Sequence, residues 1–456
     1  MTGVYLFSIA GYVCLLWLVS FYATKKSRSS EAYLVASRGL SVPFIAVLVA
    51  GTWIGGVSVV GMAQGAYIHG ISALWFQAGI WVAMGVTAAA LPRIMRGRKT
   101  YSILDVVDNL YDRKTARLAG LLQLVFSIWA VTMQIVGGGA ILSFILGDKI
   151  SMRAGMALTA AVFTLYNVVG GFVATAYTNL IHICVIFIGI FIGGLWVILD
   201  SGALARTSPE SHFFTVFGDL GPAQALSWAY INLTLGVLAQ PVINTASAAK
   251  SIAEGRKGIL IGNFLAIPVV VMAALCGITA KALFPSIPSL SALPQLLPLM
   301  PPVVAVLFLL GMWAPLMSSG SPFLMGATTL AVKGYVAPML KIKNDTTLLF
   351  ASRITTLVLS GISLLLGLFV KEILREITWL AVFLSAVVYV VCAGWIKGRI
   401  ESSFAFASLL GTIAIVGGSF LFGLVRYIHP VWPVTVYVCA VMTAGIIRAS
   451  VRTSTP

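Results

Sequence analysis

The feature that most constrains this chain is a series of thirteen apolar segments, each long enough to cross a lipid bilayer. A membrane-spanning helix needs about 20 apolar residues. Hydrophobic residues make up 59% of the chain and charged residues only 9%, whereas a soluble domain carries about 25% charged residues. The sequence therefore predicts an all-α, polytopic membrane protein with about thirteen transmembrane helices. The expected spans lie near 4–23, 43–67, 72–95, 118–147, 153–171, 177–199, 223–247, 257–284, 302–331, 348–370, 377–396, 403–424 and 431–448.

The placement of basic residues predicts the orientation of the chain. When the connections between spans are assigned alternately to two sets, the set that includes the C-terminus contains 22 of the 29 Lys and Arg residues. Cytoplasmic loops carry an excess of Lys and Arg, so we expect the N-terminus outside and the C-terminus in the cytoplasm, in the plasma (bacterial inner) membrane. The positive charge then reflects topology and contact with anionic lipid, and we expect no nucleic-acid partner. The richer set includes Lys25, Lys26, Arg28, Arg38, Arg93, Arg96, Arg98, Lys99, Lys341 and Lys343.

The acidic residues limit the chemistry of the membrane core. None of the 13 Asp and Glu residues lies in the middle of an expected span, whereas carriers driven by protons commonly use a buried carboxylate. We therefore expect a core that works with neutral oxygens, amides and aromatic rings. His182 is the only histidine near a span interior, and both a structural and a proton-carrying role remain open. The scattered cysteines predict no metal centre or cofactor, and without a nucleophile–base pair we expect no enzyme.

The second expected span, 43–67, is interrupted at its middle by Gly51-Thr-Trp-Ile-Gly-Gly-Val-Ser58. Glycine costs roughly 1 kcal/mol against alanine in a helix, so three glycines at the centre of a span need a reason. One interpretation is close packing of helix backbones. The other is an unwound segment whose backbone groups line a cavity, because exposed backbone is tolerated in a membrane only there. Both interpretations remain open at this point.

The seventh expected span, 223–247, contains a second interruption. It reads Gly236-Val-Leu-Ala-Gln-Pro-Val-Ile-Asn-Thr245, in which Pro241 removes a helical hydrogen bond and can kink the helix. Gln240 and Asn244 lie four residues apart and therefore share one face. Spans 2–6 and 7–11 form two sets of five with opposite topology, and the first span of each set is interrupted. This pairing predicts a transport site at the interface of two inverted repeats.

The ninth expected span carries a third polar cluster, Trp313-Ala-Pro-Leu-Met-Ser-Ser-Gly-Ser321. Pro315 frees a backbone carbonyl, and Ser318, Ser319 and Ser321 add hydroxyls. These hydroxyls can simply bond back to their own helix. Alternatively, the free carbonyl, the hydroxyls and the interrupted second span together make a cation site of neutral oxygens.

Between spans 3 and 4, residues 101–118 show helical spacing of apolar residues and predict an interfacial amphipathic helix.

These motifs resemble the sodium:solute symporter family, and the resemblance covers nearly the whole chain. Gly51-Thr-Trp-Ile-Gly-Gly56 followed by Gly61-Met-Ala-Gln-Gly-Ala-Tyr67 is similar to the family's first core helix, closest to the branch with the high-affinity choline transporters. Tyr166-Asn-Val-Val-Gly-Gly-Phe-Val-Ala-Thr-Ala-Tyr-Thr-Asn-Leu-Ile-His182 is similar to the family signature. Met317-Ser-Ser319 is similar to the sodium-binding turn of the eighth core helix. The resemblance implies a LeuT-type fold of 5+5 inverted repeats with additional N- and C-terminal spans.

The resemblance also implies a sodium site shared by two helices, with sodium as the coupling ion. By position, the ligands would be the carbonyls of Gly51, Ile54 and Pro315 and the hydroxyls of Ser318 and Ser319. The chain departs from the family pattern at three places. Alanine is usual where Pro315 stands, the signature usually has Thr-Asp before a glutamine instead of Thr178-Asn179 before His182, and choline carriers have a tryptophan where Ala239 stands.

We expect five regions along the chain. They are an extra span and cytoplasmic loop (1–42), a first repeat (43–200), an external loop (201–222), a second repeat (223–397) and additional C-terminal spans (398–456). The expected function is sodium-coupled symport of a small organic solute by alternating access, through a single transport unit in the bilayer. The alternatives are a sodium-independent uniporter or exchanger, or a transporter-like sensor. A channel would need charged rings or repeated filter loops, which the sequence does not show.

Polar and aromatic residues inside the core spans are the candidates for solute binding. With no acid or base to spare, the solute is expected to be neutral, zwitterionic or a small organic ion held by amides and helix ends. Small-molecule sites are mostly apolar with few polar groups, so about half of the candidates should contact solute. The candidates are Trp53, Ser58, Gln64, Trp75, Gln77, Gln134, Gln240 and Asn244.

Overall fold

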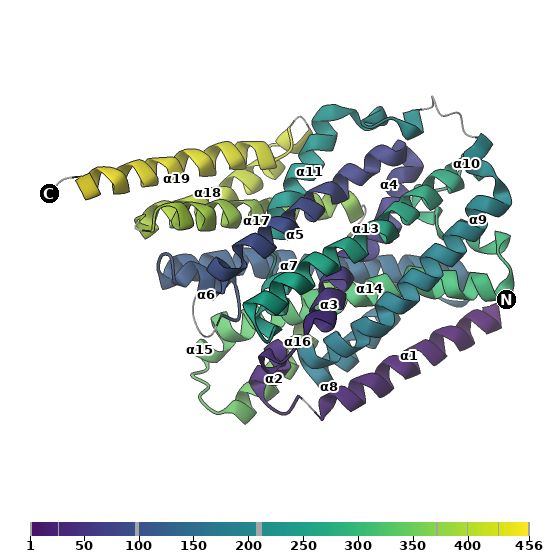
Figure 1. The fold of residues 1–456 in the computed structure, drawn as a ribbon, viewed down its shortest axis with the longest axis horizontal. Helices are drawn as coiled ribbons and strands as arrows, with labels where there is room; N and C mark the ends of the chain where they lie inside the picture. Colours follow the sequence, from purple (N-terminus) through teal and green to yellow (C-terminus); the bar gives the residue numbers. More distant parts are fainter. Residues whose placement is uncertain are drawn as a thin grey trace.

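The computed structural model describes residues 2–25, 27–95, 100–206, 212–370, 373–398, 400–426 and 428–454, and within them the chain forms helices and no named strand (Figure 1). Lys26, Arg96, Arg98 and Lys99, on which part of the orientation prediction rests, lie outside these residues. The α-helices are α1 (Thr2–Thr24), α2 (Ser30–Val35), α3 (Val42–Trp53), α4 (Met62–His69), α5 (Trp75–Ile94), α6 (Ile103–Asp108), α7 (Arg113–Leu146), α8 (Met152–Phe187), α9 (Gly194–Ser201), α10 (Ala203–Arg206), α11 (Gly221–Val237), α12 (Gln240–Ala248), α13 (Ile252–Leu283), α14 (Pro302–Ala331), α15 (Ala337–Met339), α16 (Asp345–Gly367), α17 (Ile373–Ile396), α18 (Ser402–Leu421) and α19 (Val431–Ser454).

Eleven helical runs of the described residues are long and apolar enough to cross a membrane. The longest, Met152–Ser201, has 50 residues. At 1.5 Å per residue it would be about 75 Å long, more than twice the hydrocarbon thickness of about 30 Å. Gly171 interrupts it with φ 59° and ψ −146°, a conformation almost restricted to glycine. Division at Gly171, and pairing of α3 with α4 as one interrupted span, recovers the thirteen spans expected from the sequence.

Two spans are interrupted near their middle, as the sequence predicts. α3 ends at Trp53, Ile54 has φ −93° and ψ 70°, and the chain resumes through the π-helical turn Val57–Gly61 into α4. α11 ends at Val237, and α12 begins only at Gln240, with Pro241 in its first turn. Proline suits this position because the amide that it lacks would have no helical partner. Each interruption therefore leaves backbone polar groups in the core.

α14 lies at the centre of the bundle. It packs against α7, α8, α3, α12 and α16, and its residues from 311 to 331 are all buried. α1 and the pair α18 and α19 lie at opposite sides of the bundle (Figure 1). The helix α14, which carries the predicted serines, thus contacts both interrupted spans.

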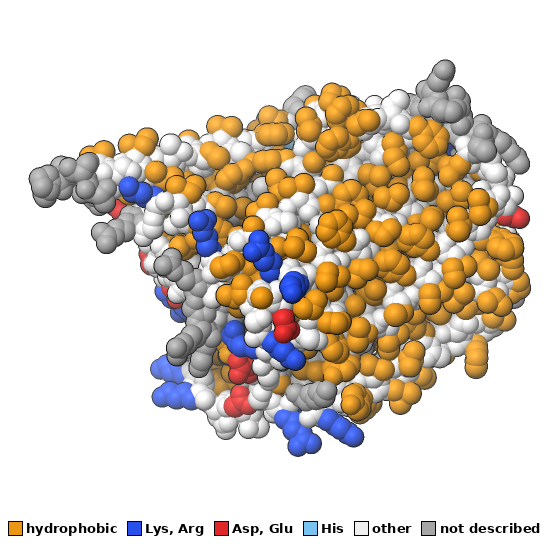
Figure 2. Space-filling model, in the orientation of Figure 1, with side chains coloured by type: hydrophobic (Ala, Val, Ile, Leu, Met, Phe, Trp, Pro, Cys, Tyr) orange, Lys and Arg blue, Asp and Glu red, His pale blue; other side chains and the backbone are white. Residues whose placement is uncertain are grey.

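The outer surface fits a bilayer. Large hydrophobic side chains such as Phe7 and Leu421 are 82% and 85% exposed, and the face in Figure 2 is mostly hydrophobic. Lys and Arg side chains on this face gather toward the end where the C-terminus and α15 lie, whereas the N-terminus lies at the other end (Figures 1 and 2). An excess of positive charge at one end is the pattern of a cytoplasmic side.

The predicted amphipathic helix at 101–118 is wrong as a single interfacial element. The structure divides this segment into α6 and the start of α7. Ser102 and Asp105 form a capping box that begins α6, and the Asp112 side chain accepts a hydrogen bond from Thr115 N at the start of α7. The apolar face of α6, including Ile103 and Val107, is buried within the protein. The apolar residues do follow helical spacing in α6, but they pack against the helix bundle.

We expect the C-terminus to lie in the cytoplasm, because the basic excess lies at that end of the molecule. A fluorescent protein that folds only in the cytoplasm, fused after Pro456, should be bright, and alkaline phosphatase at the same position should be inactive. Fusions truncated after Ser289, in the connection between α13 and α14, serve as the control and should give the opposite pair of results. An active phosphatase at the C-terminus would contradict the orientation.

Candidate functional site

The end of α3 presents backbone carbonyl oxygens to α14. The last turn of any helix leaves carbonyl groups without intrahelical partners, and here that turn is buried at the interruption. The Ser319 Oγ lies 2.7 Å from the Gly51 carbonyl oxygen and 2.8 Å from that of Thr52. The adjacent Ser318 Oγ lies 3.2 Å from the Gly51 oxygen, 3.1 Å from that of Ile54 and 3.0 Å from that of Pro315.

This oxygen cluster contains more acceptors than protons. Two hydroxyl groups supply two protons, whereas four carbonyl oxygens face them. Both serines are buried, with 0% and 1% of their surface exposed. The C-terminal end of α3 adds a partial negative charge. Surplus acceptors in a buried, electronegative pocket fit a small hard cation, which binds carbonyl and hydroxyl oxygens. The structure brings together the five groups that the sequence assigned to sodium, and sodium binding by them stays a prediction.

Glycines allow the two helices to approach so closely. A Cβ atom at Gly55 would lie 2.4 Å from Ser319 Oγ, and one at Gly51 would lie 2.7 Å from Asn179 Nδ2. The Asn179 amide in turn donates to the Ser318 carbonyl oxygen over 3.3 Å. The glycines at 51–56 therefore serve both interpretations offered by the sequence, since they permit packing and also expose backbone oxygens.

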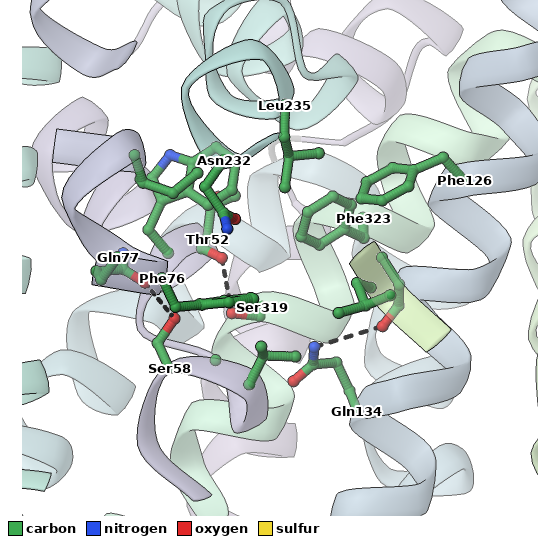
Figure 3. A pocket seen from close by; sticks show the side chains of 16 residues that line it. Thr52, Ser58, Phe76, Gln77, Phe126, Gln134, Asn232, Leu235, Ser319 and Phe323 are labelled. Atoms are coloured by element: carbon green, nitrogen blue, oxygen red, sulfur yellow. Dashed lines mark hydrogen bonds between the residues drawn. The ribbon is translucent and has the colours of Figure 1, made fainter. Parts of the chain in front are cut away.

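A cavity adjoins the oxygen cluster and shares Ser319 with it (Figure 3). It measures about 50 Å³, and a buried water needs roughly 10–15 Å³ of such space, so the cavity must widen to admit a solute. Its lining comes from α3, from the interruption that follows it (55–58), and from α5, α7, α11, α14 and α17. The lining residues are Thr52, Trp53, Gly55, Val57, Ser58, Phe76, Gln77, Ile80, Phe126, Ala130, Gln134, Asn232, Leu235, Ser319, Phe323 and Ile377.

The lining combines aromatic rings with neutral polar groups. The ring of Phe323 lies 6.3 Å from that of Trp53 and 6.1 Å from that of Phe126, in edge-to-face arrangements. None of the described residues that line the cavity carries a formal charge. The Ser58 hydroxyl donates to Gln77 Oε1 over 3.1 Å, whereas the buried Gln77 Nε2 has no hydrogen-bond partner in the described part of the chain. An unpaired buried donor costs about 1–3 kcal/mol, which a solute acceptor would offset.

Four of the eight predicted solute-binding residues line this cavity. They are Trp53, Ser58, Gln77 and Gln134. The Gln134 Oε1 accepts a hydrogen bond of 2.8 Å from Gly56 N and so also holds the interrupted span. Solute contact by these four residues stays a prediction.

Gln64 and Trp75 lie toward the connections on the other side of the bundle from α15. The Gln64 amide donates to Ser289 Oγ over 3.2 Å. The Trp75 indole donates to the Val216 carbonyl oxygen over 2.9 Å and stacks on Phe217. Both residues fasten connecting segments over the core and do not line the cavity.

Gln240 and Asn244 belong to a buried amide network at the interruption of α11 and α12. Gln240 N donates to Gln123 Oε1 over 3.0 Å, and Gln123 Nε2 donates to the Leu238 carbonyl oxygen over 2.7 Å. Gln240 Oε1 accepts from Ile103 N over 3.0 Å, and the Asn244 carboxamide bonds to the Gln240 side chain. Neither Gln240 nor Asn244 lines the cavity, and the network instead joins the start of α12 to α6 and α7.

The sequence reasoning missed Asn232 and three phenylalanines of the lining. Asn232 is a buried amide inside α11, and the rule that selected Gln240 and Asn244 applies equally to it. Phe76, Phe126 and Phe323 gave no such signal, because a phenylalanine in a membrane helix is ordinarily packing material. Only the arrangement of the three helices α5, α7 and α14 shows that their rings face one space (Figure 3).

Comparison with known proteins identifies the family. The model of the sodium:solute symporter family matches residues 33–411. The chain belongs to the sodium:solute symporter family. Its relatives include the sodium/pantothenate symporter of Haemophilus influenzae, 25% identical over 83% of this chain and 78% of that protein. The human high affinity choline transporter 1 is 28% identical over 41% of this chain, a match that spans 33% of the transporter's length.

The family's fold is also shown by a solved structure. A sodium-coupled sialic acid symporter, in a substrate-bound outward-open state, superimposes with a TM-score of 0.78, covers 98% of each chain and is 16% identical in sequence. The osmoregulated proline transporter of Bacillus subtilis is a further relative, 24% identical over 79% of this chain and 77% of that protein. The LeuT-type fold and the symporter family expected from the motifs are thereby confirmed.

We expect Gly55→Ala to weaken sodium binding about tenfold or more, because its Cβ would push Ser319 away from the carbonyl oxygens. Overpacking of this kind costs about 1–3 kcal/mol, and 1.4 kcal/mol is a factor of ten. The measurement is the sodium dependence of the melting temperature of the purified protein. Gly418→Ala on α18, where nothing lies within 4 Å of an added Cβ, is the matched control. An unchanged sodium midpoint in Gly55→Ala would remove the oxygen cluster as the sodium site.

Proposed function

We propose that this protein is a sodium-coupled symporter that moves a small organic solute across the plasma membrane by alternating access, as a single transport unit. The family assignment supports sodium-coupled transport. The observation that carries the proposal for this chain is the oxygen cluster that joins α3 to α14 beside a cavity in the core.

Sodium would bind the carbonyl oxygens of this cluster that receive no hydroxyl proton. In hydrocarbon an ion loses its hydration shell only if protein oxygens replace it. The carbonyls of Gly51, Ile54 and Pro315 and the hydroxyls of Ser318 and Ser319 form a shell without formal charge. Such a shell binds a monovalent ion weakly enough to release it. The ion would link α3 to α14, so its departure would loosen this contact and favour a different arrangement of the helices.

Two sets of hydrogen bonds between core helices and their neighbours are the candidate gates of the carrier. Toward one end, Gln64 bonds to Ser289, and the Tyr67 hydroxyl donates to the Phe284 carbonyl oxygen over 2.6 Å. Toward the other end lies the amide network of Gln240 and Gln123. A carrier needs each of these contacts to open in turn, and both are made of neutral hydrogen bonds that can break without leaving a buried charge.

The lining limits the solute to a small molecule with an apolar portion and few polar atoms. Uncharged amides and four aromatic rings suit a neutral or zwitterionic solute or a small organic ion. Choline, proline and pantothenate, which the names of three relatives print, are the first solutes to test.

The test is uptake by the purified protein in liposomes. Each radiolabelled solute is offered with an inward sodium gradient, with an equal sodium concentration on both sides, and with potassium instead of sodium. We expect accumulation above equilibrium only with the inward sodium gradient. Equal uptake under all three conditions would leave a uniporter or exchanger. Sodium and solute binding without uptake would favour a transporter-like sensor.

We expect Ser318→Ala to raise the sodium concentration for half-maximal uptake about tenfold or more, with little change in folding. A hydrogen bond or ligand contact to a charged group contributes about 1.5–3 kcal/mol, and 1.4 kcal/mol corresponds to a factor of ten. Ser408→Ala, which also removes a buried hydroxyl but on α18, is the control. A sodium midpoint that moved equally in both variants would show a general effect of the substitution and count against the site.

A further inference from the structure

Ser319 is the one polar side chain that belongs both to the oxygen cluster and to the lining of the cavity among the described residues. Its neighbour Ser318 contacts three carbonyl oxygens of the same cluster but does not line the cavity. The two hydroxyls therefore differ in their access to the cavity. The hydroxyl of Ser319 can reach either a backbone oxygen or a solute, and the hydroxyl of Ser318 can reach backbone oxygens alone.

The hydroxyl proton of Ser319 can rotate toward different acceptors. Without a cation, the hydroxyl donates to the carbonyl oxygen of Gly51 or Thr52, at 2.7 and 2.8 Å. A cation bound among the same oxygens would accept the lone pairs of the Ser319 oxygen and repel its proton. The proton must then point away from the carbonyls. Ser319 lines the cavity, so the cavity is the open space beside this hydroxyl into which the proton can turn.

We propose that sodium controls solute binding by turning the Ser319 proton from the backbone into the cavity, where it donates to an acceptor oxygen of the solute. The inference rests on the proposed function and deepens it. It makes Ser319 the physical link between ion and solute. It also assigns the solute to the class that carries an acceptor oxygen, such as a hydroxyl, carbonyl or carboxylate.

A second donor in the cavity points to the same class of solute. Gln77 is 1% exposed, its Oε1 accepts from Ser58, and its Nε2 has no partner in the described part of the chain. Figure 3 shows the Ser58–Gln77 pair and Ser319 around one space. With sodium bound, the cavity thus offers two unpaired donors beside its rings. An oxygen acceptor satisfies such donors, whereas a solute with only apolar groups leaves them unpaired.

The test compares Ser319→Ala with Ser318→Ala as a matched pair. For each protein, binding of choline, proline and pantothenate is measured with and without saturating sodium, and the ratio of the two dissociation constants is the coupling factor. Both variants should bind sodium about tenfold more weakly. At saturating sodium, Ser318→Ala should keep the coupling factor of the unmodified protein, whereas in Ser319→Ala the factor should fall to about one. Ser319→Cys keeps the volume with a weaker donor and should give an intermediate factor.

Analogues that lack the oxygen test the direction of the proton. Ethyltrimethylammonium replaces the hydroxyl of choline by hydrogen, and pyrrolidine lacks the carboxylate of proline. The preference for the parent over its analogue should be larger in sodium than in potassium, and Ser319→Ala should remove this difference. Equal loss of coupling in Ser318→Ala and Ser319→Ala would overturn the role of Ser319 while leaving sodium coupling intact. The proposed function and the inference would both be overturned if sodium did not stabilise the unmodified protein, or if it promoted binding of none of the three solutes.

Discussion

The structure depends on how backbone groups are satisfied where a membrane helix is interrupted. In hydrocarbon there is no water to bond a free carbonyl or amide, and each unsatisfied group is costly. The interruption of α3 is tolerable because α14 brings two hydroxyls to its carbonyls. That need fixes the position of α14 at the centre of the bundle and the glycines opposite it, since any larger residue at Gly55 would separate the two helices.

The two interruptions are satisfied in different ways, and this difference assigns them different roles. At the end of α11, Gln123 accepts from the Gln240 amide and donates to the Leu238 carbonyl, so donors and acceptors are matched. At the end of α3, two protons face four acceptors. A matched network needs no ligand. A surplus of acceptors would be relieved by a cation, so under the proposed function the interruption of α3 would hold the ion and that of α11 would form a gate.

The cavity adjoins the oxygen cluster at Ser319. Its rings come from helices of both repeats, and its amides Gln77, Gln134 and Asn232 come from inside α5, α7 and α11. Because none of its described lining residues is charged, recognition must come from hydrogen bonds and ring faces. A positive ion within the adjoining cluster would then be the largest local charge, which gives sodium a direct electrostatic influence on solute binding without a long pathway through the protein.

The sequence by itself determined the membrane class, the spans and both interruptions, because length, apolar composition, glycine and proline act locally along the chain. The groups of the oxygen cluster followed from the resemblance of its motifs to the family. Half of the predicted solute-binding residues, such as Trp53 and Gln77, line the cavity. Only the tertiary structure decided which face of each helix turned inward. Gln240 bonds to α6 and α7 instead of lining the cavity, and Phe323 joins the lining. These positions depend on neighbours distant in sequence that no local pattern encodes.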